Sequence, residues 1–170
     1  MRQTLINNAS PVEPAVLRTA MARYATGVCI ATALTDGGAP AGLTITSFNS
    51  LSLDPPLILW SLGLNSSNLE TFRSSDRFGI NILPSEMSEL ARVFSKSGGE
   101  KFAGVTMETG KSGVPLIAGA LVQLECMTDA QYPAGDHILF LGRVISLAIV
   151  DGAPLVFCNS AFDTLASSSH

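Results

Sequence analysis

Apolar residues recur at helical spacing in three segments of the chain, and each segment follows residues that cap helices. A Ser-x-x-Glu capping box opens the first two, and proline at the first helical position supports the first one. A glycine or a glycine pair then ends the first and the third. The pattern predicts three helices: the stripe Val16, Leu17, Ala20, Met21 and Tyr24 after Ser10-Pro11-Val12-Glu13, a short helix after Ser67-Asn68-Leu69-Glu70 that ends near Ser74, and the stripe Met87, Leu90, Ala91 and Phe94 after Ser85.

Elsewhere the pattern changes to β-branched runs and to alternation of apolar and polar residues, which is typical of strands. Asp36-Gly37-Gly38 and Asp151-Gly152 are turn sequences. Asp54-Pro55-Pro56 predicts a corner, because two successive residues lack the N–H that a strand ladder needs. The predicted strands are Val28–Thr35, Gly42–Ser47, Leu57–Leu62, Arg77–Leu83, Leu121–Met127, Ile138–Val150 and Leu155–Asn159.

This order of elements predicts a mainly β protein with helices. Strands and helices do not alternate strictly, which favours a Greek-key β-barrel with helical insertions over a parallel sheet. A length of 170 residues suits one domain. We expect that domain to span residues 10–165, with loose termini at residues 1–9 and 166–170.

The charge balance narrows the class of partner. Charged residues make up only 14% of the chain against 46% hydrophobic residues, so we expect apolar surface to be hidden in a subunit interface. The net charge is −4 and no basic stripe is present, which argues against nucleic acid as a partner. The first 25 residues hold no apolar signal-peptide core, and no apolar run is long enough to cross a membrane. We therefore expect a cytoplasmic protein that does not bind membranes.

The side chains offer little catalytic equipment of their own. Cys29, Cys126 and Cys158 lie far apart in apolar runs, which predicts buried reduced thiols rather than disulfides or a metal site. His170 is terminal, which leaves His137 without a second histidine to make a zinc site. The glycine-rich motifs of Rossmann and P-loop proteins and the nucleophile motif of hydrolases are absent. A bound organic cofactor would then carry the chemistry.

Three sequence segments carry a family resemblance: Thr46–Leu57, Arg77–Leu83 with its continuation Lys101–Val105, and Gly135-Asp136-His137 with Asp151–Leu155. In this order and spacing they resemble the flavin reductase family, and the resemblance extends from about residue 16 to residue 158. It implies the FMN-binding split-barrel fold, a Greek-key split β-barrel that forms homodimers. The family's homodimer interface helps to build the flavin site.

The resemblance also implies a set of flavin contacts. Hydroxyl groups suit the ribityl chain and the polar ring edge of a flavin. Without the resemblance, the threonines of the Gly42–Ser47 strand would be interpreted as ordinary solvent-facing residues. The implied contacts are Thr44, Thr46, Ser47, Asn49, Ser50 and Ser52 in the first segment, Ser66, Ser67 and Asn68 at the second capping box, and Ser95, Lys101 and Phe102 beyond it.

The phosphate of the flavin is expected at the start of the second helix, where free backbone N–H groups favour an anion. The alternative is that Ser67 only caps this helix. The family often has an arginine near Asn65 or Asn68, and this chain has none there. Lys101, or in its place Lys96, can supply the charge, unless both lysines are simply solvated. Because of this departure, the sequence leaves open whether the flavin is FMN or FAD.

His137 closes the Gly-Asp-His motif, the most distinctive short motif of the resemblance. A lone histidine in an apolar strand is more often a structural residue. The resemblance implies instead that His137 faces the flavin and helps to dock the nicotinamide. Gly135 permits a backbone geometry closed to other residues, and Asp136 either orients the imidazole or ends the turn. We expect His137 to position NADH or NADPH for direct hydride transfer, without shuttling a proton.

The implied function is an NAD(P)H-dependent flavin reductase, which reduces FMN or FAD and releases it to a separate monooxygenase component. Two alternatives stay open at this point. One is a flavin-binding protein without turnover, and the other is a split-barrel oxidase that holds FMN tightly.

Overall fold

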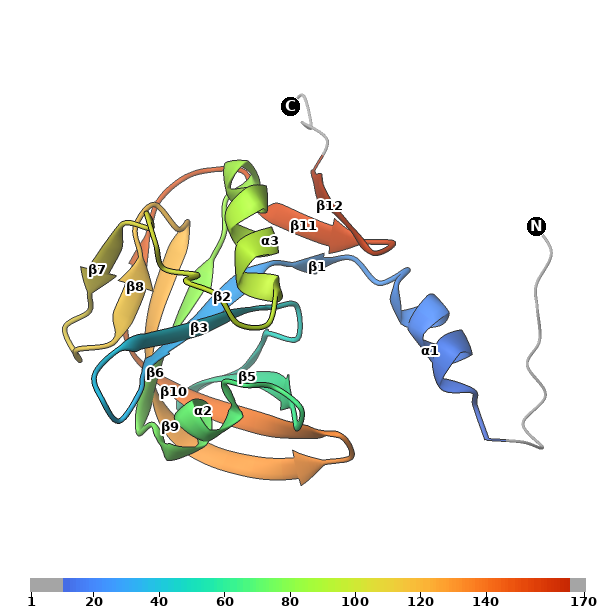
Figure 1. Ribbon diagram of the computed structural model, residues 1–170, viewed down its shortest axis with the longest axis horizontal. Coiled ribbons are helices and arrows are strands. Elements are labelled where there is room, and N and C mark those ends of the chain that lie inside the picture. The colour runs from blue at the N-terminus through green and yellow to red at the C-terminus, as the bar shows by residue number, and fades with distance from the viewer. Residues whose placement is uncertain (1–10, 166–170) are drawn as a thin grey trace.

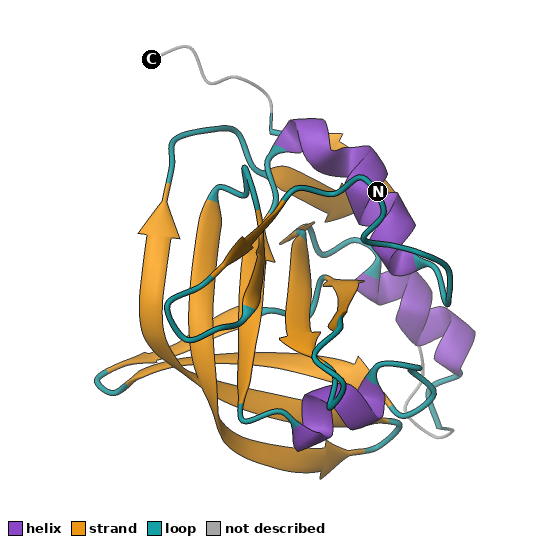
Figure 2. Ribbon diagram, turned by 60° about the vertical axis from the view of Figure 1, so that its left-hand side comes forward, coloured by secondary structure: helices purple, strands orange, loops and turns teal. Residues whose placement is uncertain are grey.

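The computed structural model describes residues 11–165, and one curved antiparallel sheet of seven strands dominates it (Figures 1 and 2). The strand order in this sheet is β3-β2-β6-β9-β10-β5-β4. Its strands are β2 (Cys29–Leu34), β3 (Pro40–Ile45), β4 (Asn49–Leu53), β5 (Pro56–Gly63), β6 (Arg77–Ile82), β9 (Val122–Ala134) and β10 (His137–Ile149).

The two edge strands of this sheet, β3 and β4, are consecutive in the chain. Only residues 46–48 separate them, a segment that spans about 10 Å when fully extended. The sheet must therefore curl until its two edges come close together. The Ser47 hydroxyl ties this connecting segment to β5, because it donates to the carbonyl of Ser61 and accepts from the Ser61 N–H, both at 3.0 Å.

Two smaller sheets and three helices complete the fold of residues 11–165. The helices are α1 (Pro14–Met21), α2 (Leu69–Ser74) and α3 (Ser88–Ser95), with a 3₁₀ turn at Ser85–Met87 before α3. β1 (Thr26–Gly27), β11 (Leu155–Cys158) and β12 (Ala161–Thr164) form one small sheet, and β7 (Met107–Thr109) pairs with β8 (Pro115–Ile117) in the other. α1 lies beside the body of the molecule with no buried residue of its own (Figure 1).

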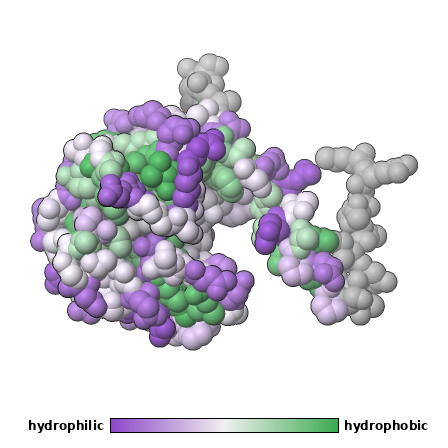
Figure 3. Space-filling model, viewed as in Figure 1, coloured by the Kyte–Doolittle hydropathy of each residue, from purple (hydrophilic) through white to green (hydrophobic). Residues whose placement is uncertain are grey.

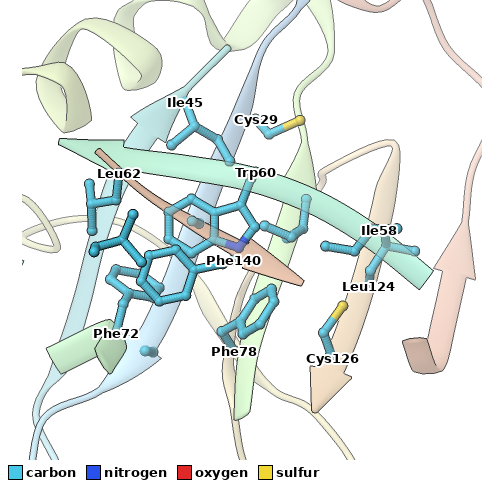
Figure 4. Packing of buried hydrophobic residues seen from close by; sticks show 14 of the residues in the cluster. Cys29, Ile45, Ile58, Trp60, Leu62, Phe72, Phe78, Leu124, Cys126 and Phe140 are labelled. Carbon is cyan, nitrogen blue, oxygen red and sulfur yellow. The ribbon is translucent and has the colours of Figure 1, made fainter. Parts of the chain in front are cut away.

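The interior of the curled sheet is filled by aromatic side chains (Figure 4). The Trp60 ring stacks on Phe140 with a centroid distance of 4.6 Å and meets the edges of Phe72 and Phe78. A second apolar cluster joins α3, through Ala91 and Phe94, to the small β1-β11-β12 sheet. These two cores hold the large sheet, α3 and the small sheet in fixed relative positions.

A buried polar network fastens β8 to the sheet. The Asn81 side chain accepts from the Ile117 N–H at 2.8 Å and donates to the Ile30 carbonyl at 2.9 Å. The Thr32 hydroxyl donates to the carbonyl of Pro115. Asn81 lies in a segment that carries the family resemblance, and here it has a structural role.

The fold confirms the mainly β prediction and all seven predicted strands, but some boundaries were wrong. α1 begins at Pro14 with Glu13 as its N-cap, so Pro14, not Pro11, holds the first helical position. Asn68, not Ser67, is the N-cap of α2, and no side chain caps that helix. β1, β4, β7, β8 and β12 were not expected, and β9 runs seven residues further than predicted. Ser10 and the termini at residues 1–9 and 166–170, which include His170, lie outside the described residues.

The predicted burial of the thiols was right for two of the three cysteines. Cys29 and Cys126 are buried, while Cys158 is half-buried, and all three are free. Burial raises the pKa of both buried thiols to about 12, and in Cys126 the Glu125 charge adds to the rise. Both therefore stay protonated and unreactive at neutral pH.

Candidate functional site

The Gly-Asp-His motif forms the tip of the long β9–β10 hairpin. Ala134 pairs with His137, so Gly135 and Asp136 are the two residues of the turn. Gly135 has a φ of +63°, while Asp136 is not in the positive-φ region, as in a type II′ turn with glycine at its first central position. The predicted need for glycine at position 135 is thus confirmed, and the turn places His137 at the very start of β10.

His137 and Asp136 form a close pair at this tip. The Nδ1 atom of His137 lies 2.6 Å from an Asp136 carboxylate oxygen. This hydrogen bond from His137, together with the charge interaction, lowers the pKa of Asp136. The imidazole is half-exposed, and with Nδ1 engaged by Asp136, its Nε2 atom is the nitrogen left for a ligand.

Backbone hydrogen bonds tie this tip to the loop before α2. Leu64 donates its N–H to the carbonyl of Asp136 at 2.9 Å, and Ser66 donates to the carbonyl of Gly63 at 3.0 Å. The Ser66 hydroxyl in turn accepts from the Asn68 N–H at 3.3 Å. The Ser66–Asn68 loop and the His137 tip, about 70 residues apart in sequence, therefore form one connected unit.

A large cleft opens between α1 and the sheet, with a volume of about 1100 Å³ (Figure 3). It brings together four of the predicted site residues: Thr46, Ser47, Asn49 and His137. Apolar and aromatic side chains from Phe48, Leu59 and Phe157 complete its walls, and α1 with the following turn forms the facing side. An apolar wall with a few convergent polar groups is typical of a site for a flat organic ligand.

Two smaller hollows of about 270 and 80 Å³ lie between β3, the α2 loop and the segment after α3. Ser67, Asn68 and Lys101 line both of them. The residues found only in the smaller hollow include Thr44, Ser66, Ser95 and Lys96, and Phe102 lines only the larger one.

Lys101 is held at the border of these two hollows. Its Nζ atom donates to the carbonyls of Phe94 at 3.3 Å and Gly42 at 3.5 Å. An ammonium group has three protons, so one stays free for a ligand. Burial lowers the pKa of Lys101, because a charged group loses hydration there, and an anion in the hollow would compensate for that loss.

Several predicted site residues also have structural contacts. The Thr44 hydroxyl donates to the carbonyl of Ala91 at 2.7 Å and so links β3 to α3. The Ser95 hydroxyl donates to the carbonyl of Arg92 within its own helix. Phe102 packs edge-on against Phe94, with a centroid distance of 4.9 Å. These contacts leave Ser67, whose side chain is exposed and forms no hydrogen bond with another residue of the range 11–165, as the free hydroxyl of the α2 loop.

Ser50 and Ser52 lie apart from this group. Both are on β4, where Ser50 pairs with Ile58 and Ser52 with Leu57, and neither lines the cleft or the two smaller hollows. Sequence reasoning missed the α1 side of the cleft, to which Arg18, Met21 and Tyr24 contribute. No motif marks these residues, and only tertiary structure brings them opposite His137.

Other features of the described residues stand apart from the cleft. A hollow of about 560 Å³ near Arg77 and Ser112 holds none of the predicted site residues. Residues 11–165 contain no cluster of metal-ligating side chains and no helix of the length and apolarity needed to cross a membrane.

Comparison with known proteins assigns this arrangement to a family. The chain is 40% identical over 145 residues to an FMN reductase (NADH) of Agrobacterium fabrum, covering 85% of this chain and 82% of the relative. It is 35% identical to the reductase component of a flavin-dependent trigonelline monooxygenase of Acinetobacter baylyi, covering 90% of this chain and 49% of that longer protein.

A solved structure extends this likeness to the fold. It is an NADH:FAD oxidoreductase of Streptomyces globisporus in complex with NAD and FAD fragments, and it superimposes with a TM-score of 0.88 at 31% identity. The alignment covers 95% of this chain and all of that one. The family description "Flavin reductase like domain" matches residues 21–166. The chain is a member of the flavin reductase-like domain family.

Proposed function

We propose that the cleft and the two smaller hollows together form a flavin reductase site, at which NADH reduces FMN or FAD. One observation carries the proposal: the fold gathers Thr46, Ser47, Asn49 and His137 around one apolar cleft, close to hollows that contain a partly desolvated lysine. The NADH-dependent reductases to which the chain is similar support the same reaction.

The described residues offer suitable contacts for each part of a flavin: the ring system, the ribityl chain and the phosphate. The apolar walls of the cleft suit the ring system, and the hydroxyl groups beside it suit the ring edge and the ribityl chain. Lys101 and Ser67 would hold the phosphate, because Lys101 keeps a free proton and Ser67 a free hydroxyl. Thr44, Ser66, Asn68, Ser95 and Phe102 would shape this end. Ser50 and Ser52 line neither the cleft nor the hollows, and they would act only through β4, which carries Asn49 into the cleft.

A bound flavin would supply the ring that accepts the hydride, and the protein would position the nicotinamide next to that ring. Asp136 holds the His137 ring through Nδ1, so that Nε2 can hydrogen-bond the carboxamide of the nicotinamide. Gly135 sets the turn that aims both residues. The Phe48 and Leu59 walls exclude water from one side of the cleft, and no residue there needs to exchange a proton during hydride transfer.

An open cleft suits a protein that releases its reduced product. We propose that reduced flavin leaves for a separate oxygenase component, as the similarity to a monooxygenase reductase component supports. The proposal includes one domain over residues 10–165 that folds as a split barrel, which the strong curl of the sheet supports. The cytoplasmic location and the absence of membrane and nucleic-acid partners stay predictions.

We also propose that the chain forms a homodimer. α1 exposes Val16, Leu17 and Met21 to solvent, and β4 exposes Leu53 at 94% of its surface. An eight-residue helix with no buried residue is not stable by itself in water, so a second copy that covers its apolar face would stabilise it.

One assay tests the proposed function against its alternatives. NADH and NADPH oxidation is followed at 340 nm with FMN, FAD or riboflavin added, and in their absence. A released-flavin reductase oxidises NADH rapidly only when free flavin is supplied. Turnover without added flavin in the purified protein would indicate tightly held FMN instead, and flavin binding without any NADH oxidation would indicate a non-catalytic flavin carrier.

A further inference from the structure

The wall of the large cleft formed by α1 carries a positive charge opposite His137. Arg18 lies in the last turn of α1, and Ala22, one turn later on the same helix face, lines the cleft with it. Val16 and Ala20 lie on the opposite face of α1. Arg18 is thus directed toward the cleft by helix geometry, as is Met21, and it points away from Val16, the residue of the proposed dimer contact on the opposite face.

No described residue that lines the cleft carries a carboxylate to neutralise this arginine. Among the described residues that line it, Arg18 is the only lysine or arginine, and none is aspartate or glutamate. Asp136, the acidic residue next to His137 in the chain, is engaged by that histidine. Arg18 also forms no ion pair within residues 11–165. A permanent cation without a counter-ion on an apolar wall favours an anionic ligand.

The backbone near Arg18 is held in place by contacts with the β11–β12 turn. Asn159 donates its N–H to the carbonyl of Ala22 at 2.6 Å, and the Cys158 thiol lies 3.8 Å from the same oxygen. The β11–β12 turn therefore holds the C-terminal end of α1, one helical turn from Arg18. The side chain starts from an anchored segment of backbone, although α1 has no buried residue.

We infer that Arg18 binds the diphosphate of the nicotinamide dinucleotide while His137 docks its nicotinamide. This inference rests on the proposed function and adds the residue that recognises the remote part of the substrate. A guanidinium group binds phosphate oxygens through paired N–H donors, and it keeps its charge at every physiological pH. A cleft of about 1100 Å³ has room for both ends of the dinucleotide.

Under this inference, the phosphate of the flavin and the diphosphate of the dinucleotide bind to different basic residues. Lys101 serves the hollows beside the α2 loop, and Arg18 serves the cleft wall formed by α1. Loss of Arg18 should therefore weaken dinucleotide binding and leave flavin binding unchanged. The additional 2′-phosphate of NADPH has the same chemistry, so a comparison of NADH with NADPH shows which phosphate Arg18 contacts.

The test compares Arg18→Gln with Arg23→Gln, a matched control that removes the same charge from the exposed segment just after α1 but outside the cleft lining. Three hydride donors are used at saturating FMN: NADH, NADPH and 1-benzyl-1,4-dihydronicotinamide, which has no phosphate. In a separate titration, the Kd of NAD⁺ is measured by calorimetry. Melting curves establish that both variants are folded.

We expect Arg18→Gln to raise the KM for NADH and the Kd of NAD⁺ about tenfold, with kcat within twofold of wild type. The rate with the benzyl donor should not change, because that donor offers nothing for Arg18 to bind. The wild-type KM for NADH should also rise with salt, and that of Arg18→Gln should rise less. A larger loss with NADPH than with NADH would assign Arg18 to the 2′-phosphate, which contradicts a diphosphate contact.

Equal losses with NADH and the benzyl donor would overturn the inference, because they indicate a structural defect. Equal effects of Arg18→Gln and Arg23→Gln would overturn it as well, since only the overall charge would then matter. A wild-type protein that does not oxidise NADH at all would contradict the proposed function itself, which is a different result from either of these.

Discussion

The backbone N–H of Leu64 donates a 2.9 Å hydrogen bond to the carbonyl of Asp136. This bond joins the turn that carries His137 to the loop that carries Ser66 and Ser67. A shift of either segment is passed to the other, so the residues proposed for the nicotinamide and for the flavin phosphate keep their relative positions.

His137→Ala should lower kcat/KM for NADH about five- to 150-fold, because one positioning hydrogen bond is worth roughly 1–3 kcal/mol. Flavin affinity should stay nearly unchanged, since the phosphate contacts lie at Lys101. His137→Asn, which keeps a donor, should recover part of the loss. Stopped-flow reduction of flavin-loaded protein measures this. A folded His137→Ala protein with wild-type reduction rates would rule out the positioning role.

Lys101→Gln should weaken FMN binding about tenfold, equivalent to roughly 1.4 kcal/mol, and leave riboflavin binding unchanged. The reason is that riboflavin lacks the phosphate that Lys101 is proposed to hold. Lys96→Gln, which removes a charge from the rim of the smaller hollow, is the matched control. Fluorescence titration with both flavins checks the result. A larger effect of Lys96→Gln would assign the phosphate to that lysine.

Val16→Glu should dissociate the proposed homodimer, because it places a charge on the exposed apolar face of α1. Light scattering on the wild type should give about twice the 17.8 kDa mass of the chain, and the variant should approach the monomer mass. Glu13→Gln, just before α1, serves as the control. A wild-type mass of one chain at micromolar concentration with flavin present would contradict the dimer.

Glu125→Gln should destabilise the protein by roughly 1–3 kcal/mol at neutral pH. The Glu125 carboxylate is 4% exposed, and it accepts hydrogen bonds from the Ser112 hydroxyl and from the N–H groups of Lys111 and Ser112. Burial acts to raise its pKa, but these hydrogen bonds outweigh burial and lower it. Gly110 leaves room for the carboxylate, since a Cβ there would lie 2.6 Å from it.

The sign of the pH dependence follows from that lowered pKa. The stabilisation by Glu125 is present above the ordinary pKa of a glutamate, about 4.3, and is lost as the pH falls through the lower pKa of the folded protein. The stability gap between wild type and Glu125→Gln should therefore shrink below about pH 4. Urea unfolding at several pH values measures it, with the exposed Glu100→Gln as control. A gap that is constant with pH would contradict a charged Glu125.

Local patterns predicted most of the strands, since alternation and turn residues act within a few positions. β4 was missed although Ser50, Leu51, Ser52 and Leu53 alternate, because its apolar residues face solvent in the single chain. The start of α1 was misplaced because Ser10-Pro11 and Glu13-Pro14 both resemble a helix start in sequence. In the structure Pro14 occupies the first helical position. The length of β9 depends on its pairing with β10, which no local pattern encodes.

The candidate site was predictable in part for a related reason. Gly135 and His137 lie in one short motif, and the structure gives them the turn geometry that the motif implies. Arg18 and Tyr24 line the cleft only because the β11–β12 turn holds the end of α1 in place. Structural duties such as that of the Thr44 hydroxyl, which bonds to Ala91, depend on α3 and are invisible in the sequence.

The hydrogen bonds between Ser47 and Ser61 make the melting temperature of the protein depend on whether a ligand is bound in the cleft. The segment that connects the two edge strands is tied to β5 there through one hydroxyl, and the same segment borders the cleft. A ligand that contacts both this segment and Ser61 reinforces the link and adds RT ln(1 + [L]/Kd) to the free energy of unfolding, about 2.7 kcal/mol at a hundredfold excess over Kd. The flavin-free protein should therefore have a lower melting temperature than the flavin-bound protein. Release of reduced flavin then leaves the protein less stable until another flavin binds.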